Sequence, residues 1–132
     1  MDGSNNTRTI LVVEDERPLA EAVRLRLEKD GYGVVVAKSV EQALGYMEDL
    51  PKVDVIWLDH YLTGKQNGFD FVAKVKTNEK WKAVPIFVVS NTGAPDKKAT
   101  YMSFGVNKYY VKADYRLDTI ITDIEEFLNK GE

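Results

Sequence analysis

The chain has 132 residues, a length that fits one domain with a sizeable buried core. Hydrophobic residues make up 44% of it, which argues against global disorder, and the net charge of −3 argues against a nucleic-acid-binding module, whose phosphate contacts need a basic face. The absence of cysteine excludes disulfides and thiolate metal sites and suits a reducing cytoplasm. The polar start MDGSNNT lacks the apolar core of a signal peptide, and no apolar run approaches the ~20 residues that span a bilayer. We therefore expect a cytoplasmic protein without a membrane segment, in which residues 1–7 form a disordered tail and residues 8–130 form one domain with no output domain.

Five short apolar runs predict five strands. In chain order they are TILVV (9–13), GVVVA (33–37), DVIWL (54–58), VPIFVV (84–89) and KYYV (108–111). Most of these runs are continuous rather than alternating, which is typical of strands that are covered on both faces.

Stretches with helical spacing separate the runs. Their start and stop signals are the capping-box pattern Ser39–Gln42, Asn67 as a cap, Pro95 at a first helical position, and Gly31 and Gly105 as stops. The clearest helix is the last, whose predicted apolar face is Leu117, Ile120, Ile121, Ile124, Phe127 and Leu128. The alternation of five strands and five helices predicts an α/β fold, a parallel sheet with helices on both sides.

Polar residues follow these strands. Because right-handed crossovers return the chain to the same starting edge, residues that follow parallel strands gather at the opposite edge. Here they are Glu14, Asp15, Asp59, Ser90 and Lys112. Clustered carboxylates repel one another unless a cation intervenes, and Mg²⁺ is usually held by one or two carboxylates, waters and a phosphate. Since an aspartate can attack phosphorus while a hydroxyl and a lysine contact phosphoryl oxygens, the residues supply the parts of a phosphoryl-accepting site.

The motifs VVEDE, WLD, VVS and YYVK, in this order within residues 8–130, resemble the receiver domain of two-component response regulators. The resemblance implies a (βα)₅ flavodoxin-like three-layer sandwich with a five-stranded parallel sheet of order 2-1-3-4-5. It implies that Asp59 accepts a phosphoryl group from a sensor histidine kinase or a histidine phosphotransfer protein. Downstream proteins, or a second copy that forms a homodimer, would dock on the face of helix 4, strand 5 and helix 5, without direct contact to nucleic acid or membrane.

The same resemblance implies a metal site. Asp15, Asp59 and the backbone carbonyl of Tyr61 would ligate Mg²⁺, with Mn²⁺ as an alternative ion. Glu14 would act largely through a metal-bound water.

The resemblance also implies roles for residues around the phosphoryl group. Ser90 takes the place of the family's switch serine or threonine, Lys112 that of its lysine, and Tyr109 that of the aromatic residue that swings inward on activation. We hypothesise that Tyr61 and Thr92, two residues beyond the acceptor acid and the switch serine, set how slowly water removes the phosphoryl group.

Two departures from the family pattern stand out. Ala113 follows Lys112 where receivers usually have a proline after a cis bond, which a residue other than proline forms at a cost of about 2.5–4 kcal/mol. The loop after the acceptor carries Thr63 where proline is common, and Gly68 lies one residue later than usual. These departures keep open a degenerate receiver, an interaction module that works without phosphorylation.

Two enzyme or cofactor classes fit the sequence less well. A phosphatase or mutase with an aspartyl nucleophile characteristically has a second aspartate two residues later, where this chain has Tyr61. A flavodoxin needs a phosphate cradle after its first strand, where the acids at 14–16 would repel phosphate. We therefore expect a signalling phosphoacceptor rather than an enzyme, with at most self-phosphorylation from small donors and slow self-dephosphorylation. His60, the only histidine, is interpreted as a loop residue near the acidic site and not as a phosphate relay.

Overall fold

Five strands form one parallel sheet of order β2-β1-β3-β4-β5 in the computed structural model, which describes residues 8–130. In chain order the strands are β1 (Thr9–Val13), β2 (Gly33–Ala37), β3 (Val55–Leu58), β4 (Ile86–Ser90) and β5 (Lys108–Val111). The flavodoxin-like order 2-1-3-4-5 is thus confirmed. The tail expected at residues 1–7 lies outside the described residues.

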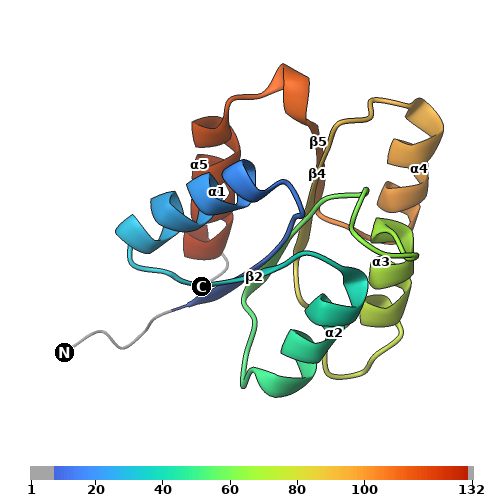
Figure 1. Cartoon of the computed structure of the whole chain (residues 1–132), viewed down its shortest axis with the longest axis horizontal. Coiled ribbons are helices and arrows are strands. Elements are labelled where there is room, and N and C mark those ends of the chain that lie inside the picture. Colours follow the sequence, from blue (N-terminus) through green and yellow to red (C-terminus); the bar gives the residue numbers. More distant parts are fainter. Residues whose placement is uncertain (1–7, 131–132) are drawn as a thin grey trace.

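Helices cover both faces of the sheet (Figure 1). They are α1 (Arg17–Lys29), α2 (Val40–Asp49), α3 (Gly68–Lys76), α4 (Pro95–Ser103) and α5 (Leu117–Lys130). Figure 1 shows α1 and α5 on one side of the strands and α2, α3 and α4 on the other. Among residues 8–130, none of the helices combines the length and the apolarity that crossing a membrane requires.

The two layers of helices explain why the strand sequences are continuously apolar. In β1, Ile10 and Val12 belong to the hydrophobic core under α1 and α5, whereas Leu11 and Val13 belong to the core under α2, α3 and α4. Successive side chains of a strand point to opposite faces, and here both faces are buried.

Helix starts and stops lie close to their predicted positions. Pro95 is the first residue of α4, and Gly105, beyond its end, has a φ of 91°, which glycine adopts without strain. Of the two hydrogen bonds of the capping box predicted at Ser39, one is present and the other is replaced. The Ser39 hydroxyl accepts from the Gln42 amide at 3.1 Å, but the Gln42 side chain accepts from the amide of Lys38 rather than from that of Ser39.

Three predictions about strand ends and helix faces need correction. β3 begins one residue later than predicted, and β4 is shifted toward the C-terminus, so that Ser90 is its last residue. Phe127, predicted on the core face of the last helix, is 36% exposed, with its ring centroid 5.5 Å from that of Phe87. It therefore lies at the rim of the core, while its neighbour Leu128 is buried.

Candidate functional site

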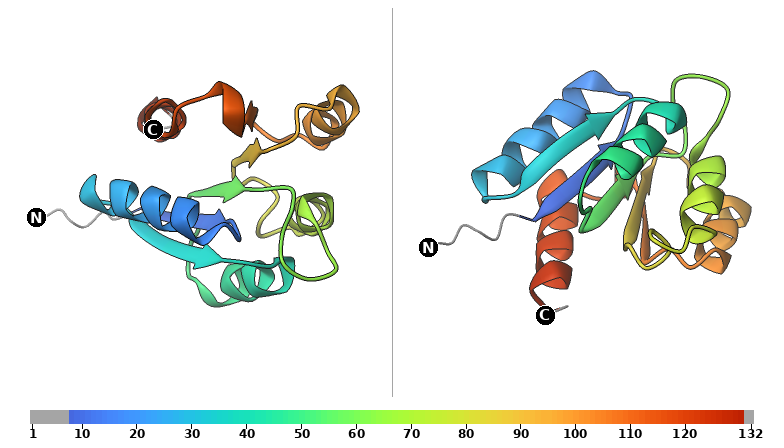
Figure 2. Two further views of the ribbon diagram at one scale, coloured as in Figure 1. Left: turned by 45° about the horizontal axis from the view of Figure 1, so that its top comes forward. Right: turned by 90° about the horizontal axis from the view of Figure 1, so that it is seen from below.

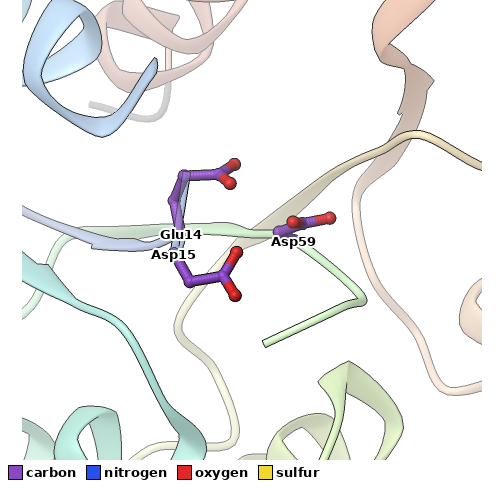
Figure 3. A group of neighbouring side chains, drawn as sticks. All are labelled: Glu14, Asp15 and Asp59. Atoms are coloured by element: carbon purple, nitrogen blue, oxygen red, sulfur yellow. The ribbon is translucent and has the colours of Figure 1, made fainter. Parts of the chain in front are cut away.

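The residues that follow β1 and β3 lie side by side at one edge of the sheet. The two strands are neighbours, with Val13 paired to Leu58, and the Asp59 amide donates to the Val13 carbonyl at 2.9 Å. Figure 3 shows that this pairing brings Glu14 and Asp15 next to Asp59. Each of the three acids offers a carboxylate oxygen, and these oxygens lie within 4.8 Å of one another. The register of the sheet therefore builds the acidic cluster.

Burial sets the charge state of the cluster. Glu14 is fully buried and Asp59 is 2% exposed, while Asp15 is half-buried. Burial, followed by the charge of Asp59, raises the pKa of Glu14 from 4.5 to about 7. Burial also raises the pKa of Asp59, against the opposing charge of Lys112. Carboxylates with so little water around them are stabilised by any cation that comes close.

The donor chemistry of the cluster fits a hard divalent ion. Within residues 8–130, Oδ1 of Asp59 is buried and has no hydrogen-bond partner, a condition that native proteins rarely tolerate. Carboxylate oxygens are the side-chain ligands that Mg²⁺ and Mn²⁺ favour. Glu14, Asp15 and Asp59 are therefore the residues that could hold such an ion. The backbone carbonyl of Tyr61 as a further ligand stays a prediction.

Lys112 reaches the same cluster from the end of β5. Its Nζ lies 3.1 Å from Oε1 of Glu14 and 3.4 Å from Oδ2 of Asp59. Burial opposes the charge of this lysine, but the bonds and charges of the neighbouring carboxylates raise its pKa, so it is an ammonium. No peptide bond between residues 8 and 130 is cis, and Lys112–Asp114 forms a short 3₁₀ helix. Alanine at 113 is thus compatible with a lysine placed against the Asp59 carboxylate.

Glu16 is a fourth acid of the site, one that the sequence analysis did not assign to it. Its Oε1 lies 2.9 Å from Nζ of Lys112, closer than the other carboxylates. Glu16 occupies the N-cap position of α1, yet its side chain makes no capping bond in the described part of the chain. The signal was a run of three acids, of which only Glu14 and Asp15 were assigned to the site.

A series of hydrogen bonds runs from the end of β4 to β5. Ser90 is fully buried, and its Oγ accepts from the Thr92 amide at 3.3 Å. The Thr92 carbonyl accepts from the Tyr109 hydroxyl at 2.5 Å, while the Thr92 hydroxyl accepts from the Ala94 amide at 3.1 Å. Tyr109 is 9% exposed and thus faces inward. The roles of Ser90 and Tyr109 as switch residues stay predictions.

The loop after Asp59 carries one exposed aromatic side chain. Tyr61 is 51% exposed, whereas Thr63 donates from its hydroxyl to Oδ2 of Asp15 at 3.3 Å. The Thr63 amide also donates to the carbonyl of Lys38 at 3.1 Å, which ties this loop to the connection between β2 and α2. The effect of Tyr61 and Thr92 on the lifetime of a phosphoryl group stays a prediction.

His60 is a loop residue next to Asp59, as predicted, but it is also buried against α4. It is 3% exposed, and its Nδ1 lies 2.6 Å from the hydroxyl oxygen of Tyr101 in α4. Burial, followed by the charge of Lys97, lowers the pKa of His60, so the imidazole is neutral. No sequence signal connected the residue after β3 with a residue in α4.

Comparisons with known proteins identify the family. The family model described as response regulator receiver domain matches residues 10–125. This chain belongs to the response regulator receiver family. The receiver is 32% identical to the phosphate regulon transcriptional regulatory protein PhoB of Pseudomonas aeruginosa over 105 residues. The aligned residues make up 80% of this chain and 45% of PhoB. The receiver thus spans less than half the length of the curated relatives that it matches.

Solved structures share the fold of this receiver. The phosphorylated cyanobacterial phytochrome response regulator RcpA is similar with a TM-score of 0.84 and 24% identity, over 96% of each chain. The Mn²⁺-bound form of the response regulator Rcp1 has a TM-score of 0.80 and 24% identity, over 91% of this chain and 93% of Rcp1. The predicted fold class is confirmed by both the topology and these similarities.

Proposed function

We propose that this receiver accepts a phosphoryl group on Asp59, in the cytoplasm, from a histidine kinase or a histidine phosphotransfer protein. The environment of Asp59 carries the proposal. Oδ1 is free of hydrogen bonds within the described chain, and Oδ2 lies 3.4 Å from Nζ of Lys112. A carboxylate oxygen held in this way can act as a nucleophile toward phosphorus.

The transfer forms one bond and breaks one. Oδ1 of Asp59 attacks the phosphorus atom while the bond between phosphorus and the donor's leaving group breaks, and the leaving group keeps the electron pair. Lys112 donates to a phosphoryl oxygen as a point charge. Catalysis of such a transfer rests almost entirely on positioning and charge neutralisation.

The charges of the site explain why a metal ion is part of the proposal. The carboxylates of Glu14, Asp15, Glu16 and Asp59 outnumber the single ammonium of Lys112, so the site repels a negatively charged donor. A bound Mg²⁺ or Mn²⁺ ion supplies positive charge to the phosphoryl oxygens. The receiver's own acids would hold that ion, and Lys112 would act beside it.

Phosphorylation is proposed to alter binding at the surface of α4, β5 and α5. Exposed apolar side chains support this choice of surface, because Met102, Tyr115 and Phe127 are 44%, 45% and 36% exposed. The partner would be a downstream protein or a second copy of the chain. The receiver is then a signalling phosphoacceptor, whose chemistry is limited to its own phosphorylation and the slow loss of its own phosphoryl group.

Intact mass measurement tests this function directly. The receiver is incubated with acetyl phosphate, with and without Mg²⁺, alongside Asp59→Asn and the control Asp49→Asn, which makes the same change on the exposed surface of α2. We expect a gain of about 80 Da in the wild type and in the control, which is lost in Asp59→Asn and without Mg²⁺. A mass gain that persists in Asp59→Asn would place the acceptor elsewhere.

The alternative is a degenerate receiver that binds partners without phosphorylation. The alanine at 113 and the altered loop motivate it, while the contact of Lys112 with Asp59 argues against it. The absence of a mass gain with acetyl phosphate and with purified histidine kinases, together with no Mg²⁺ binding, would favour this alternative.

A further inference from the structure

Helix α4 is anchored to the rest of the protein by few buried side chains. Of its residues Pro95–Ser103, only Tyr101 is buried, and its N-cap residue Ala94 makes no side-chain capping bond in the described chain. The three views of Figures 1 and 2 place α4 beside α3 at the edge of the molecule. A helix held by so few buried groups opens locally at a low free-energy cost.

The one buried side chain of α4 is hydrogen-bonded to the residue that follows Asp59. The hydroxyl oxygen of Tyr101 lies 2.6 Å from Nδ1 of His60, and the two residues are 0% and 3% exposed. A buried hydrogen bond of this kind is costly to break, because neither partner can turn to water. His60 is joined to Asp59 by a peptide bond, so a shift of the Asp59 backbone moves the His60 end of the hydrogen bond to Tyr101.

The start of α3 encloses this bond. The ring of Phe69 lies 4.7 Å from that of His60 and 4.5 Å from that of Tyr101, measured between centroids. The Gly68 amide donates to the His60 carbonyl at 2.9 Å, and a side chain at position 68 would collide with the Tyr101 hydroxyl. The close approach of Tyr101 therefore requires glycine at this position.

We propose that the His60–Tyr101 hydrogen bond is a latch that holds α4 against the acceptor loop and transmits the state of Asp59 to α4. The proposal rests on the proposed function, since it assigns a signalling role to phosphorylation at Asp59. The latch runs through β3 and α4. It shares no hydrogen bond with the series that joins Ser90, Thr92 and Tyr109 at the ends of β4 and β5, although the rings of Tyr101 and Tyr109 are packed with their centroids 5.9 Å apart.

Amide hydrogen exchange of the peptides that cover α4 and α5 tests the latch. The variants are Tyr101→Phe, which removes only the hydroxyl, His60→Leu, and the two combined. The control is Tyr110→Phe, which removes a hydroxyl that donates to Asp123 at 2.7 Å on the opposite face of the sheet. Without phosphorylation, we expect exchange in α4 to become about 2- to 10-fold faster in Tyr101→Phe and His60→Leu, the range that the loss of one net hydrogen bond gives.

The same comparison is then made after incubation with acetyl phosphate and Mg²⁺, with intact mass recorded on each sample. In the wild type and in Tyr110→Phe, phosphorylation should change exchange in α4. In the latch variants, compared at an equal phosphorylated fraction, the change in α4 exchange should be at most about half of the wild-type change. The double variant should add little to either single variant, because both remove one interaction. His60→Asn, which can still hydrogen-bond near the Nδ1 position, should restore part of the response.

The possible failures are distinguishable. No mass gain in the wild type overturns the proposed function, and with it the signalling role of the latch. A mass gain with an unchanged response of α4 in Tyr101→Phe overturns the latch alone. Faster exchange to the same degree in α4 and α5 also overturns it, because that result shows a general loss of stability instead of a local one.

Discussion

Nζ of Lys112 lies 2.9 Å from Oε1 of Glu16 and 3.4 Å from Oδ2 of Asp59, so one ammonium bridges the loops that follow β1 and β3. An ammonium has three N–H donors, and with Glu14 at 3.1 Å all of them face carboxylates. A phosphoryl oxygen that binds Lys112 must therefore replace one carboxylate. Asp59 is the partner most easily replaced, because its contact is the longest and, once phosphorylated, it would carry its negative charge on the phosphoryl oxygens instead of on the carboxyl group.

Lys112→Ala is expected to slow phosphorylation by acetyl phosphate by about 100-fold, since removing one donor to a developing charge typically has an effect of this size. The measurement is the phosphorylated fraction against time by intact mass at saturating Mg²⁺. Lys108→Ala is the matched control, because it removes an exposed lysine at the other end of β5 and should leave the rate unchanged. A Lys112→Ala rate within about two-fold of the wild type would show that the lysine does not contact the phosphoryl group.

The stability of the metal-free receiver should fall as the pH rises. Between pH 4.5 and about 7 the unfolded chain has released the Glu14 proton, whereas the folded chain, in which burial raises the pKa of Glu14 to about 7, retains it. The folded state therefore binds more protons, and its free energy of unfolding falls by up to about 1.4 kcal/mol per pH unit. The raised pKa values of Asp59 and Glu125 act in the same direction, whereas the lowered pKa of His60 opposes them below about pH 6.5.

Urea unfolding in the presence of a chelator, from about pH 5 to pH 8, measures this dependence. Glu14→Gln should flatten it, because the amide has no proton to lose. Mg²⁺ should raise the stability most at the upper end of the range, where the acids are charged and the ion binds only the folded state. A slope that is the same in the wild type and in Glu14→Gln would contradict the prediction.

Gly68→Ala should destabilise the protein by about 1–3 kcal/mol, the usual cost of forcing an extra group into a packed site. The new methyl group would collide with the hydroxyl of Tyr101 and would lie 3.1 Å from Cα of His60 and 3.2 Å from the carbonyl oxygen of Asp59. Gly45→Ala is the control, since a methyl group there has no atom within 4 Å. It should stabilise α2 by about 0.5–1 kcal/mol, because alanine loses less backbone entropy in a helix.

Chemical denaturation of both alanine variants measures the loss, and a further substitution shows which contact causes it. Tyr101→Phe in the Gly68→Ala background should recover part of the loss, because it removes the closest atom. No recovery would assign the loss to the backbone contacts with His60 and Asp59.

Tyr61→Asn is expected to shorten the lifetime of the phosphoryl group several-fold. Tyr61 is 51% exposed and lies two residues after the acceptor, so its ring can reduce the access of water to the phosphoryl group without excluding it. Loss of the phosphoryl mass after removal of the donor gives the rate. Tyr61→Phe keeps the ring and should lose the group at the wild-type rate, and equal lifetimes in wild type and Tyr61→Asn would refute this role of the ring.

Position along the chain was sufficient to predict the α/β class and most of the acidic site, whereas the strand order 2-1-3-4-5 was implied by the resemblance to receivers. Residues at the ends of parallel strands meet at one edge whatever their side chains, so the sequence alone predicts that Glu14, Asp15, Asp59 and Lys112 lie together. The ends of β3 and β4 were less accurate, because residue type does not mark the last ladder bond: the polar Asp54 and the apolar Val84 lie outside the strands, and the polar Ser90 lies inside β4.

Contacts made by side chains across the fold could not be predicted in this way. Glu16 was given no role in the site, and its bond to Lys112 depends on a side-chain direction that the sequence does not encode locally. The bond between His60 and Tyr101 joins residues 41 positions apart, one on a loop and one in a helix with a weak apolar pattern. A single buried residue in α4 produces no periodicity to detect.

The single buried anchor of α4 also bears on how receivers of this kind diverge. Apart from Tyr101, the positions of α4 are exposed or half-buried, and substitutions at such positions usually change stability little. The outer surface of this helix, which belongs to the proposed partner-binding surface, can therefore change during evolution at little cost to folding stability. Paralogous receivers in one cell could separate their signals in this way, while the shared chemistry at the acidic edge stays the same.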